Sequence, residues 1–207
     1  MGRLMARLYD RVMRKSEDAC LSGWRKDLLA KIDGRVLEIG AGTGVNLPFY
    51  PRSIKRLVMS EPDRHMRAKL AARLEGMDNS PVELSDSSAD ALPFSAGDFD
   101  VVVCMLVLCS VPDINRAIGE IRRVLAPEGR LVFMEHVAAD HRPERLKWQR
   151  RLEPLWQRVS GNCHLARRTE QAIIDCGFAF ERIHRESMRN TIPLTRATIR
   201  GVAVRQG

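Results

Sequence analysis

The chain has 207 residues, of which 44% are hydrophobic and 29% charged, as in an ordinary globular domain. No apolar run approaches the roughly 20 residues that cross a bilayer, and the N-terminus lacks the apolar core of a secretion signal. The net charge of +8 fits a solvated basic surface or an anionic substrate or lipid headgroup, whereas aromatic residues (5%) do not interleave with the basic runs, so nucleic acid is not expected. We expect one cytoplasmic domain over residues 1–207, with residues 1–33 as an N-terminal helical cap.

Two helices are predicted for this cap. Residues 3–15 carry apolar residues near helical spacing, with arginine and lysine on the other side, and a second helical pattern covers about 17–32. We expect Leu4, Leu8 and Trp24 to face a ligand pocket beneath the cap. The basic first helix, residues 3–15, also suits peripheral contact with an anionic membrane.

Strands and helices then alternate along the chain. The run DVVVCMLVL is continuously apolar, as a strand buried on both faces must be. Alternation predicts an α/β fold with a doubly wound, mostly parallel sheet of seven strands and a C-terminal antiparallel hairpin. The predicted strands are residues 36–39, 56–60, 81–85, 100–108, 130–137, 178–184 and 198–204. The predicted helices are residues 63–76, 118–125 and, apart from a break at 161–164, 143–176.

The turn after the first strand, VLEIGAGTGVNLPFYP, contains three glycines. Its third glycine comes one residue earlier than in the G-x-G-x-x-G fingerprint, and Pro48 interrupts the helix that would hold a pyrophosphate. A nicotinamide-dependent reductase is therefore disfavoured. Glu61 ends the second strand about 20 residues later, where a carboxylate accepts hydrogen bonds from a ribose. The pattern favours a ligand with a ribose and an amino-acid tail but no phosphates.

Several segments resemble the class I S-adenosylmethionine-dependent methyltransferases. They are VLEIGAGTG, Glu61, DALPFSAGDFDVVVC, RRVLAPEGRLVFMEH and the late hairpin, in the family's order over roughly residues 30–205. The segments GTGVNLPFYP, VVVCMLVLCSV, FMEHVAA and NCHLARR resemble the thiol S-methyltransferase-like branch, which carries a methyltransferase type 11 domain and is associated with alkyl thiols and membranes. Bacterial phospholipid N-methyltransferases share a similar glycine turn.

The resemblance implies a seven-stranded Rossmann-like fold with S-adenosyl-L-methionine as the cofactor. Glu61 would hold the ribose, and Pro62 or Asp63 would border the adenine. Ser88 stands where the family usually has aspartate, so Ser88 with Ala89, or Asp86, would contact the adenine. The methionine portion is assigned to the glycine turn: Glu38, Gly40, Ala41, Gly42, Gly44 and Asn46. The residues beneath the sulfonium are assigned to the end of the fourth strand: Cys104, Met105 and Leu106.

Two histidines are candidates for catalysis. His136 closes the fifth strand and His164 lies in the segment that often covers the substrate in this fold; either could act as a base or orient the acceptor. A hydrogen-bonded interior histidine is the alternative for His136, and a buried structural cysteine is favoured over a nucleophile at Cys104. The five cysteines form no CxxC pair, and Cys163-His164 finds no further ligands at suitable spacing, so no metal site or disulfide framework is predicted.

Methyl transfer from a sulfonium is an in-line displacement with a neutral leaving group, so no acid is needed. A thiol acceptor is already partly ionised near neutral pH and needs no strong base, whereas an amine or oxygen acceptor would rely more on a base such as His136 or His164. The absence of an obvious catalytic dyad is therefore consistent with a thiol.

The acceptor stays open between several classes. A small or lipid-like molecule is expected: an alkyl thiol, phosphatidylethanolamine or a quinone precursor. A non-catalytic cofactor-binding interaction domain is the alternative from another class. A monomer and a homodimer are equally compatible with the sequence.

Overall fold

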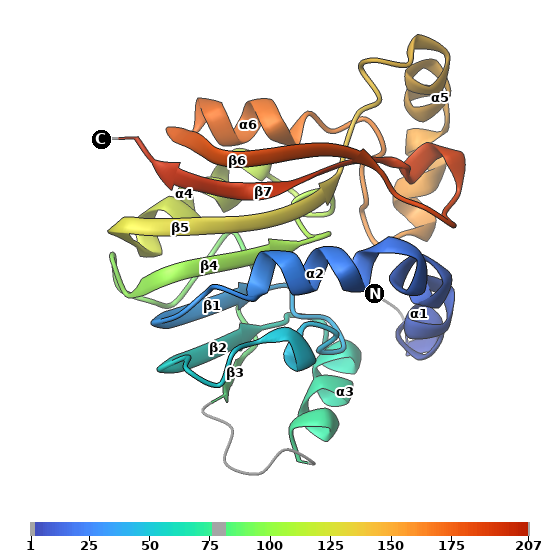
Figure 1. Cartoon of the computed structure of the whole chain (residues 1–207). Coiled ribbons are helices and arrows are strands. Elements are labelled where there is room, and N and C mark those ends of the chain that lie inside the picture. Colours follow the sequence, from blue (N-terminus) through green and yellow to red (C-terminus); the bar gives the residue numbers. More distant parts are fainter. Residues whose placement is uncertain (1–2, 76–81, 207) are drawn as a thin grey trace.

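The computed structural model describes residues 3–75 and 82–206, which form one seven-stranded sheet (Figure 1). Its strand order is β3-β2-β1-β4-β5-β7-β6. The first five strands pair in parallel, and β7 lies antiparallel between β5 and β6. The strands are β1 Arg35–Ile39, β2 Arg56–Ser60, β3 Val82–Ser85, β4 Phe99–Met105, β5 Leu125–His136, β6 Phe178–Ser187 and β7 Ala197–Arg205. The doubly wound fold and its C-terminal hairpin are confirmed.

Helices cover both faces of the sheet. Side chains of α4 and α6 pack on one face, and those of η1, α2 and α3 pack on the other, as Figure 1 shows for the helices that flank the strands. The helices are α1 Arg3–Ser16, the π-helical turn η1 Glu17–Leu21, α2 Ser22–Leu29, α3 Arg64–Leu74, α4 Ile114–Val124, α5 Pro143–Val159 and α6 Thr169–Asp175, with short 3₁₀ turns η2 Leu47–Phe49 and η3 Pro193–Thr195. None of these described helices is long and apolar enough to cross a membrane.

Local chemistry explains the central elements. β4 is rich in valine and buried along nearly its whole length, because helices cover it on both faces. Asp63 and Asp113 begin α3 and α4 as N-caps, each accepting two backbone N–H groups of the following turn. Prolines at 48 and 51 allow only the short η2 turn after β1, as the sequence indicated.

Several predicted boundaries were wrong: α4 and β5 begin four and five residues earlier than expected, and α5 and α6 are separated by residues 160–168 rather than 161–164. Two further differences concern the kind of element. The apolar run 100–108 was expected to be one strand, but β4 ends at Met105 because Leu106 adopts a left-handed conformation with φ of 61° and turns the chain out of the sheet. The expected helix 17–32 is instead the π-helical turn η1 followed by α2. Apolar character marked burial correctly in both places, but it does not distinguish a strand from a buried turn.

The expected orientation of the first helix was wrong at Leu8. Trp24 is buried in the core, as predicted, but Leu8 is 39% exposed. The face of α1 that turns inward carries Ala6 and Met13 instead, which lie about two helical turns apart. The side chain of Leu4 lies outside the described residues.

Two glycine substitutions test the packing of this fold. Gly201 in β7 faces the irregularity in β6, and a Cβ added there would overlap the backbone carbonyl oxygen of Arg182. We expect Gly201→Ala to lower the free energy of unfolding by about 1–3 kcal/mol, the scale of overpacking. Gly119 in α4 is the control, because a Cβ there meets nothing within 4 Å. Gly119→Ala should leave stability unchanged or raise it by about 0.5–1 kcal/mol in urea titrations; equal midpoints for the two variants would contradict this account.

Candidate active site

The strand order of the sheet reverses between β1 and β4, and ligands of doubly wound folds bind at the carboxyl ends of the strands beside such a point. The segments that follow β1, β2, β4 and β5 meet at this edge. The helices α1 and α5 lie at the same end of the sheet (Figure 1). The edge therefore gathers most of the residues predicted from the sequence.

The glycine turn after β1 is shaped for close approach by a ligand. Gly40 has φ of 64°, and a Cβ there would overlap the side chain of Val107. Gly42 has φ of 58°, and a Cβ there would have no protein atom nearer than the carbonyl oxygen of Gly40, at 4.0 Å. Packing against Val107 thus requires glycine at position 40. Gly42 instead leaves open space that a bound molecule can fill.

Glu61 follows β2 and faces this turn. Its Oε2 accepts the backbone N–H of Gly42 at 2.8 Å, and its Oε1 accepts that of Asp63 at 2.8 Å. Burial raises the pKa of Glu61 above its usual range. Each carboxylate oxygen keeps a further lone pair, so the group can still accept hydrogen bonds from two hydroxyls. The arrangement fits the predicted ribose contact.

Glu38 is the second buried carboxylate at this edge. Asn46 donates to its Oε1 at 2.9 Å and the Tyr50 hydroxyl donates to its Oε2 at 2.6 Å. Arg25 donates to Asn46 at 2.7 Å and forms an ion pair with Glu17 at 2.8 Å. Burial raises the pKa of Glu38 to about 7, despite the hydrogen bonds that favour its ionised form. This network ties the N-terminal helices to the glycine turn.

A second contact fixes α1 over the turn. The Thr43 hydroxyl donates to Asp10 at 2.6 Å, and Asp10 also accepts from Arg73 of α3 at 2.9 Å. Burial raises the pKa of Tyr9, the neighbouring residue, to about 12. The charge of Arg25 partly offsets this rise in the pKa.

The residues predicted to contact adenine lie beyond β3. The Ser88 hydroxyl donates to Asp90 at 2.5 Å, so its oxygen is already oriented by a neighbour. Ala89 is buried, whereas Asp86 and Pro62 are exposed. Asp90, rather than Asp86, is the carboxylate that contacts Ser88, and no pattern in the sequence favoured it.

The end of β4 combines a buried thiol with a strained backbone. Cys104 is fully buried and its thiol lies 3.8 Å from Glu135, whose charge, together with burial, keeps the pKa of the thiol well above its usual range. Met105 is nearly buried, and its sulfur accepts from Arg25 at 3.6 Å. Leu106 occupies the left-handed region that leucine rarely adopts, held by its N–H donating to Met134 at 2.7 Å. Such strain is typical of functional turns.

The two candidate histidines have different surroundings. His136 is buried, its Nε2 lies 2.8 Å from the sulfur of Cys163, and its Nδ1 has no partner among the described residues. His164 is half-buried, and its Nδ1 lies 3.0 Å from Glu153 and 2.7 Å from Gln157. His136 therefore lies in a thiol-lined interior, while His164 holds together the segment that follows α5.

The fold also creates a cluster that sequence spacing did not indicate. The ligand atoms of Cys109, His136 and Cys163 all lie within 4.8 Å of one another. Cys109 follows β4 and His136 ends β5. Their places at the carboxyl ends of neighbouring strands could therefore have indicated from the sequence that these two residues lie close together. Nothing in the sequence placed Cys163 beside them.

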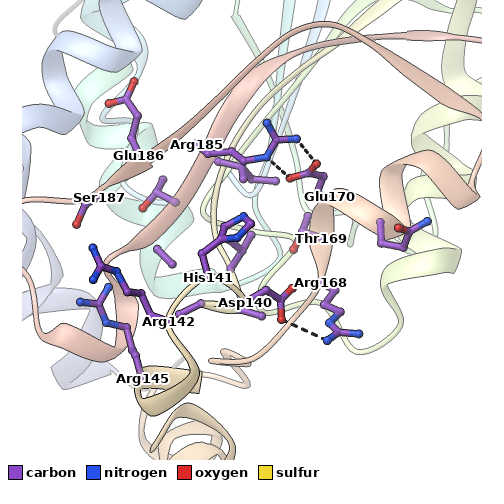
Figure 2. A pocket seen from close by; sticks show the side chains of 17 residues that line it. Asp140, His141, Arg142, Arg145, Arg168, Thr169, Glu170, Arg185, Glu186 and Ser187 are labelled. Carbon is purple, nitrogen blue, oxygen red and sulfur yellow. Dashed lines mark hydrogen bonds and ion pairs between the residues drawn. The ribbon is translucent and has the colours of Figure 1, made fainter. Parts of the chain in front are cut away.

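A cavity of about 930 Å³ lies elsewhere on the described part of the chain. It is lined by the segment after β5, by α6 and by the hairpin, and Figure 2 shows two ion pairs on its wall, Arg168 with Asp140 and Arg185 with Glu170. It contains none of the residues predicted to bind the cofactor.

Comparisons with known proteins show the family to which the chain is similar. Residues 37–133 match the family described as methyltransferase domain. Thiol S-methyltransferase TMT1B of Rattus norvegicus is 35% identical over 195 residues, covering 86% of this chain and 73% of that protein. Phosphatidylethanolamine N-methyltransferase of Cereibacter sphaeroides is 36% identical over 111 residues, 53% of this chain and 54% of that protein. A solved S-adenosylmethionine-dependent methyltransferase of Thermotoga maritima superposes with a TM-score of 0.70 at 20% identity, covering 100% of both chains.

The sheet order, the glycine turn and the acidic residue after β2 are those of a class I methyltransferase fold. The match to the rat enzyme spans the glycine turn and most of both chains. The chain belongs to the class I S-adenosylmethionine-dependent methyltransferase family, in its thiol S-methyltransferase-like branch.

The raised pKa of Glu38 predicts how cofactor affinity varies with pH. If the methionine portion of S-adenosylmethionine lies beside Glu38, as the sequence predicts, its sulfonium and ammonium would favour ionised Glu38 and lower the pKa of that group in the complex. Affinity should be constant above about pH 7 and fall up to tenfold per unit below it, until the pKa of the complex is reached. Calorimetry between about pH 6 and pH 8 measures this. Glu38→Gln is the control and should lose the slope; an unchanged slope would assign the titration to another group, such as Glu61.

Proposed function

We propose that the chain transfers the methyl group of S-adenosylmethionine to the sulfur of a small thiol. The observation that carries this proposal is the composition of the edge where β4 and β5 end. That edge presents two cysteine thiols, an imidazole and an indole, and the buried carboxylate beside them, Glu135, is already engaged with backbone N–H groups. The name of the rat relative, whose sequence matches most of this chain, supports the same acceptor class.

The cofactor assignments extend the same proposal. Glu61 binds the ribose hydroxyls, and the turn from Glu38 to Gly44 holds the methionine portion, with Gly42 supplying the open space for close backbone approach. Ser88 and Asp90 border the adenine. When bound, the cofactor supplies a methyl group on a sulfonium that leaves as a neutral thioether.

The chain's own contribution is orientation and exclusion of water. The docked helix α1 and the segment after α5 enclose the edge, and holding two reactants in line is worth roughly 7–11 kcal/mol of the barrier. A thiol acceptor is partly ionised near pH 7 and needs only modest help to lose its proton. His136 is the residue placed to orient that acceptor, because it is buried at the end of β5.

A phospholipid N-methyltransferase is the second candidate. It is favoured by the partial match to the bacterial phosphatidylethanolamine enzyme and by apolar side chains exposed on two helices at the site's end of the sheet. These are Leu8 and Val12 on α1, and Trp148, Leu155 and Val159 on α5. Peripheral membrane contact through α1 remains part of this proposal, and it applies equally to an enzyme whose thiol acceptor is lipophilic.

A methyl-transfer screen tests the proposal. Purified protein and labelled cofactor are combined with small alkyl thiols, phosphatidylethanolamine vesicles and a quinone precursor, and the methylated product is identified by mass spectrometry. We expect transfer to the thiols, at a rate that rises with pH as the acceptor ionises. Transfer only to the amine headgroup or to the quinone precursor would overturn the thiol assignment. Cofactor binding without transfer to any acceptor would favour the interaction domain.

Removal of the carboxylate at Glu61 tests the ribose assignment. Glu61→Ala should weaken cofactor binding by about 1.5–3 kcal/mol, the scale for hydrogen bonds to a charged group. Glu83, in the neighbouring strand β3, is the control because its side chain is 56% exposed and pairs with Arg56. Glu83→Ala should bind the cofactor like the parent protein in calorimetry. Equal affinities for all three proteins would mean that the ribose is held elsewhere.

A further inference from the structure

The cluster of Cys109, His136 and Cys163 has the composition of a metal site with an open position. Its three ligand atoms lie within 4.8 Å of one another, and tetrahedral coordination at ~2.3 Å to sulfur and ~2.0 Å to nitrogen needs separations of roughly 3.5–3.8 Å. The separation of His136 Nε2 and Cys163 Sγ, 2.8 Å, would have to open by less than an ångström. Two thiolates and one imidazole form a soft donor set that suits zinc, and three protein ligands leave a fourth position free.

We propose that this cluster binds one zinc ion and that the fourth position receives the thiol acceptor. The sequence predicted no metal, because the three ligands lie on separate segments without a recognisable spacing. The role of the fourth position rests on the thiol S-methyltransferase function proposed above. The ion site itself rests only on the positions of the three ligand atoms.

Hydrogen bonds hold two of the ligand-bearing segments together before any ion binds. The side chain of Asn162 donates to the carbonyl of Ser110 at 2.9 Å, and the backbone N–H of His164 donates to that of Cys109 at 2.8 Å. Arg167 donates to two further carbonyls in the same turn, at 2.7 Å each. The segment containing Cys163 is thus fixed against the turn containing Cys109. A site held this firmly loses little entropy when the ion binds.

Groups around the cluster act in both directions: the contact with Cys163, burial and the charge of Glu135 raise the pKa of the Cys109 thiol, whereas two neighbours favour thiolates. Trp156 donates its indole N–H to the Cys163 sulfur at 3.3 Å, and the guanidinium of Arg167 interacts electrostatically with both thiols. Zinc with two thiolates and a neutral imidazole carries no net charge, so its burial does not leave an isolated ion in the interior. Glu135, Glu153 and Tyr9 are the other titratable groups facing this region.

His136 directs its Nε2 at the cluster. His136 is only 5% exposed, yet its Nδ1 has no hydrogen-bond partner among the described residues. Metal-bound imidazoles normally place one nitrogen on the ion and donate the other to an outer partner. Nε2, which faces the Cys163 sulfur, is the nitrogen that would bind the ion, and Nδ1 would donate to a water molecule outside the cluster.

The resulting step balances without any other reactant. The acceptor thiol binds zinc as a thiolate in place of water and releases its proton to solvent. Its sulfur forms the new bond to the methyl carbon while the bond from that carbon to the sulfonium breaks, and the electron pair stays on the departing thioether sulfur. The methylated product is a neutral thioether, a weaker ligand than the thiolate, so it dissociates.

Metal content and cobalt substitution test the site without measuring activity. Protein purified without chelator should contain close to one equivalent of zinc by elemental analysis, and cobalt exchanged into it should give the visible and near-ultraviolet bands of a tetrahedral thiolate complex. Cys109→Ser and Cys163→Ser should each lose the bands. Cys176→Ser is the matched control and should keep them, because Cys176 lies at the end of α6, outside the cluster.

A second measurement needs no variant. Zinc should slow alkylation of Cys109 and Cys163 in the parent protein, located by peptide mass spectrometry, while leaving alkylation of Cys176 unchanged. Absence of metal together with unprotected thiols, or a Cys109–Cys163 disulfide in its place, would overturn the proposal. Binding of S-adenosylhomocysteine, measured alongside, separates this outcome from failure of the proposed function, because the cofactor residues lie outside the cluster.

Discussion

The carboxylate of Glu135 is the constraint on which the active edge depends. It ends β5 and accepts backbone N–H groups from Val107 and Leu108 at 2.9 Å and from Cys109 at 3.2 Å. Burial raises the pKa of Glu135 to about 7 even though these donors favour its ionised form. A turn that would otherwise expose three unpaired donors in the interior is therefore closed by one side chain from the next strand.

Both halves of the site use this turn. Val107 packs against Gly40, so the turn after β4 helps to set the shape of the glycine turn where the cofactor is proposed to bind. Cys109 lies at the other end of the same turn, and its carbonyl accepts the N–H that anchors the segment after α5. Cofactor cradle and acceptor cluster are consequently placed relative to each other by a single short segment, which is the positional accuracy that an in-line displacement requires.

Sequence reasoning succeeded where the signal is local. The glycine turn and Glu61 follow consecutive strands of one βαβ unit, so spacing along the chain determines their meeting. It failed at Leu8, because the inward face of α1 is selected by tertiary contacts such as Asp10 with Thr43 rather than by apolar period alone. It also missed the approach of Cys163 to Cys109, since that depends on hydrogen bonds between two irregular segments, for which neither hydrophobic period nor propensity carries information.

The buried acidic residues of the site have few cations near them among the described residues. Glu38 and Glu135 both have pKa values raised to about 7 by burial, and Arg25 is the cation that approaches Glu38 through Asn46. A cationic ligand seated between such groups gains more than it would at an exposed carboxylate, because the surroundings screen poorly. Burial of these incompletely compensated carboxylates costs stability in the free protein, and the proposed sulfonium cofactor would recover that cost on binding, so the burial that destabilises the empty site would favour its ligand.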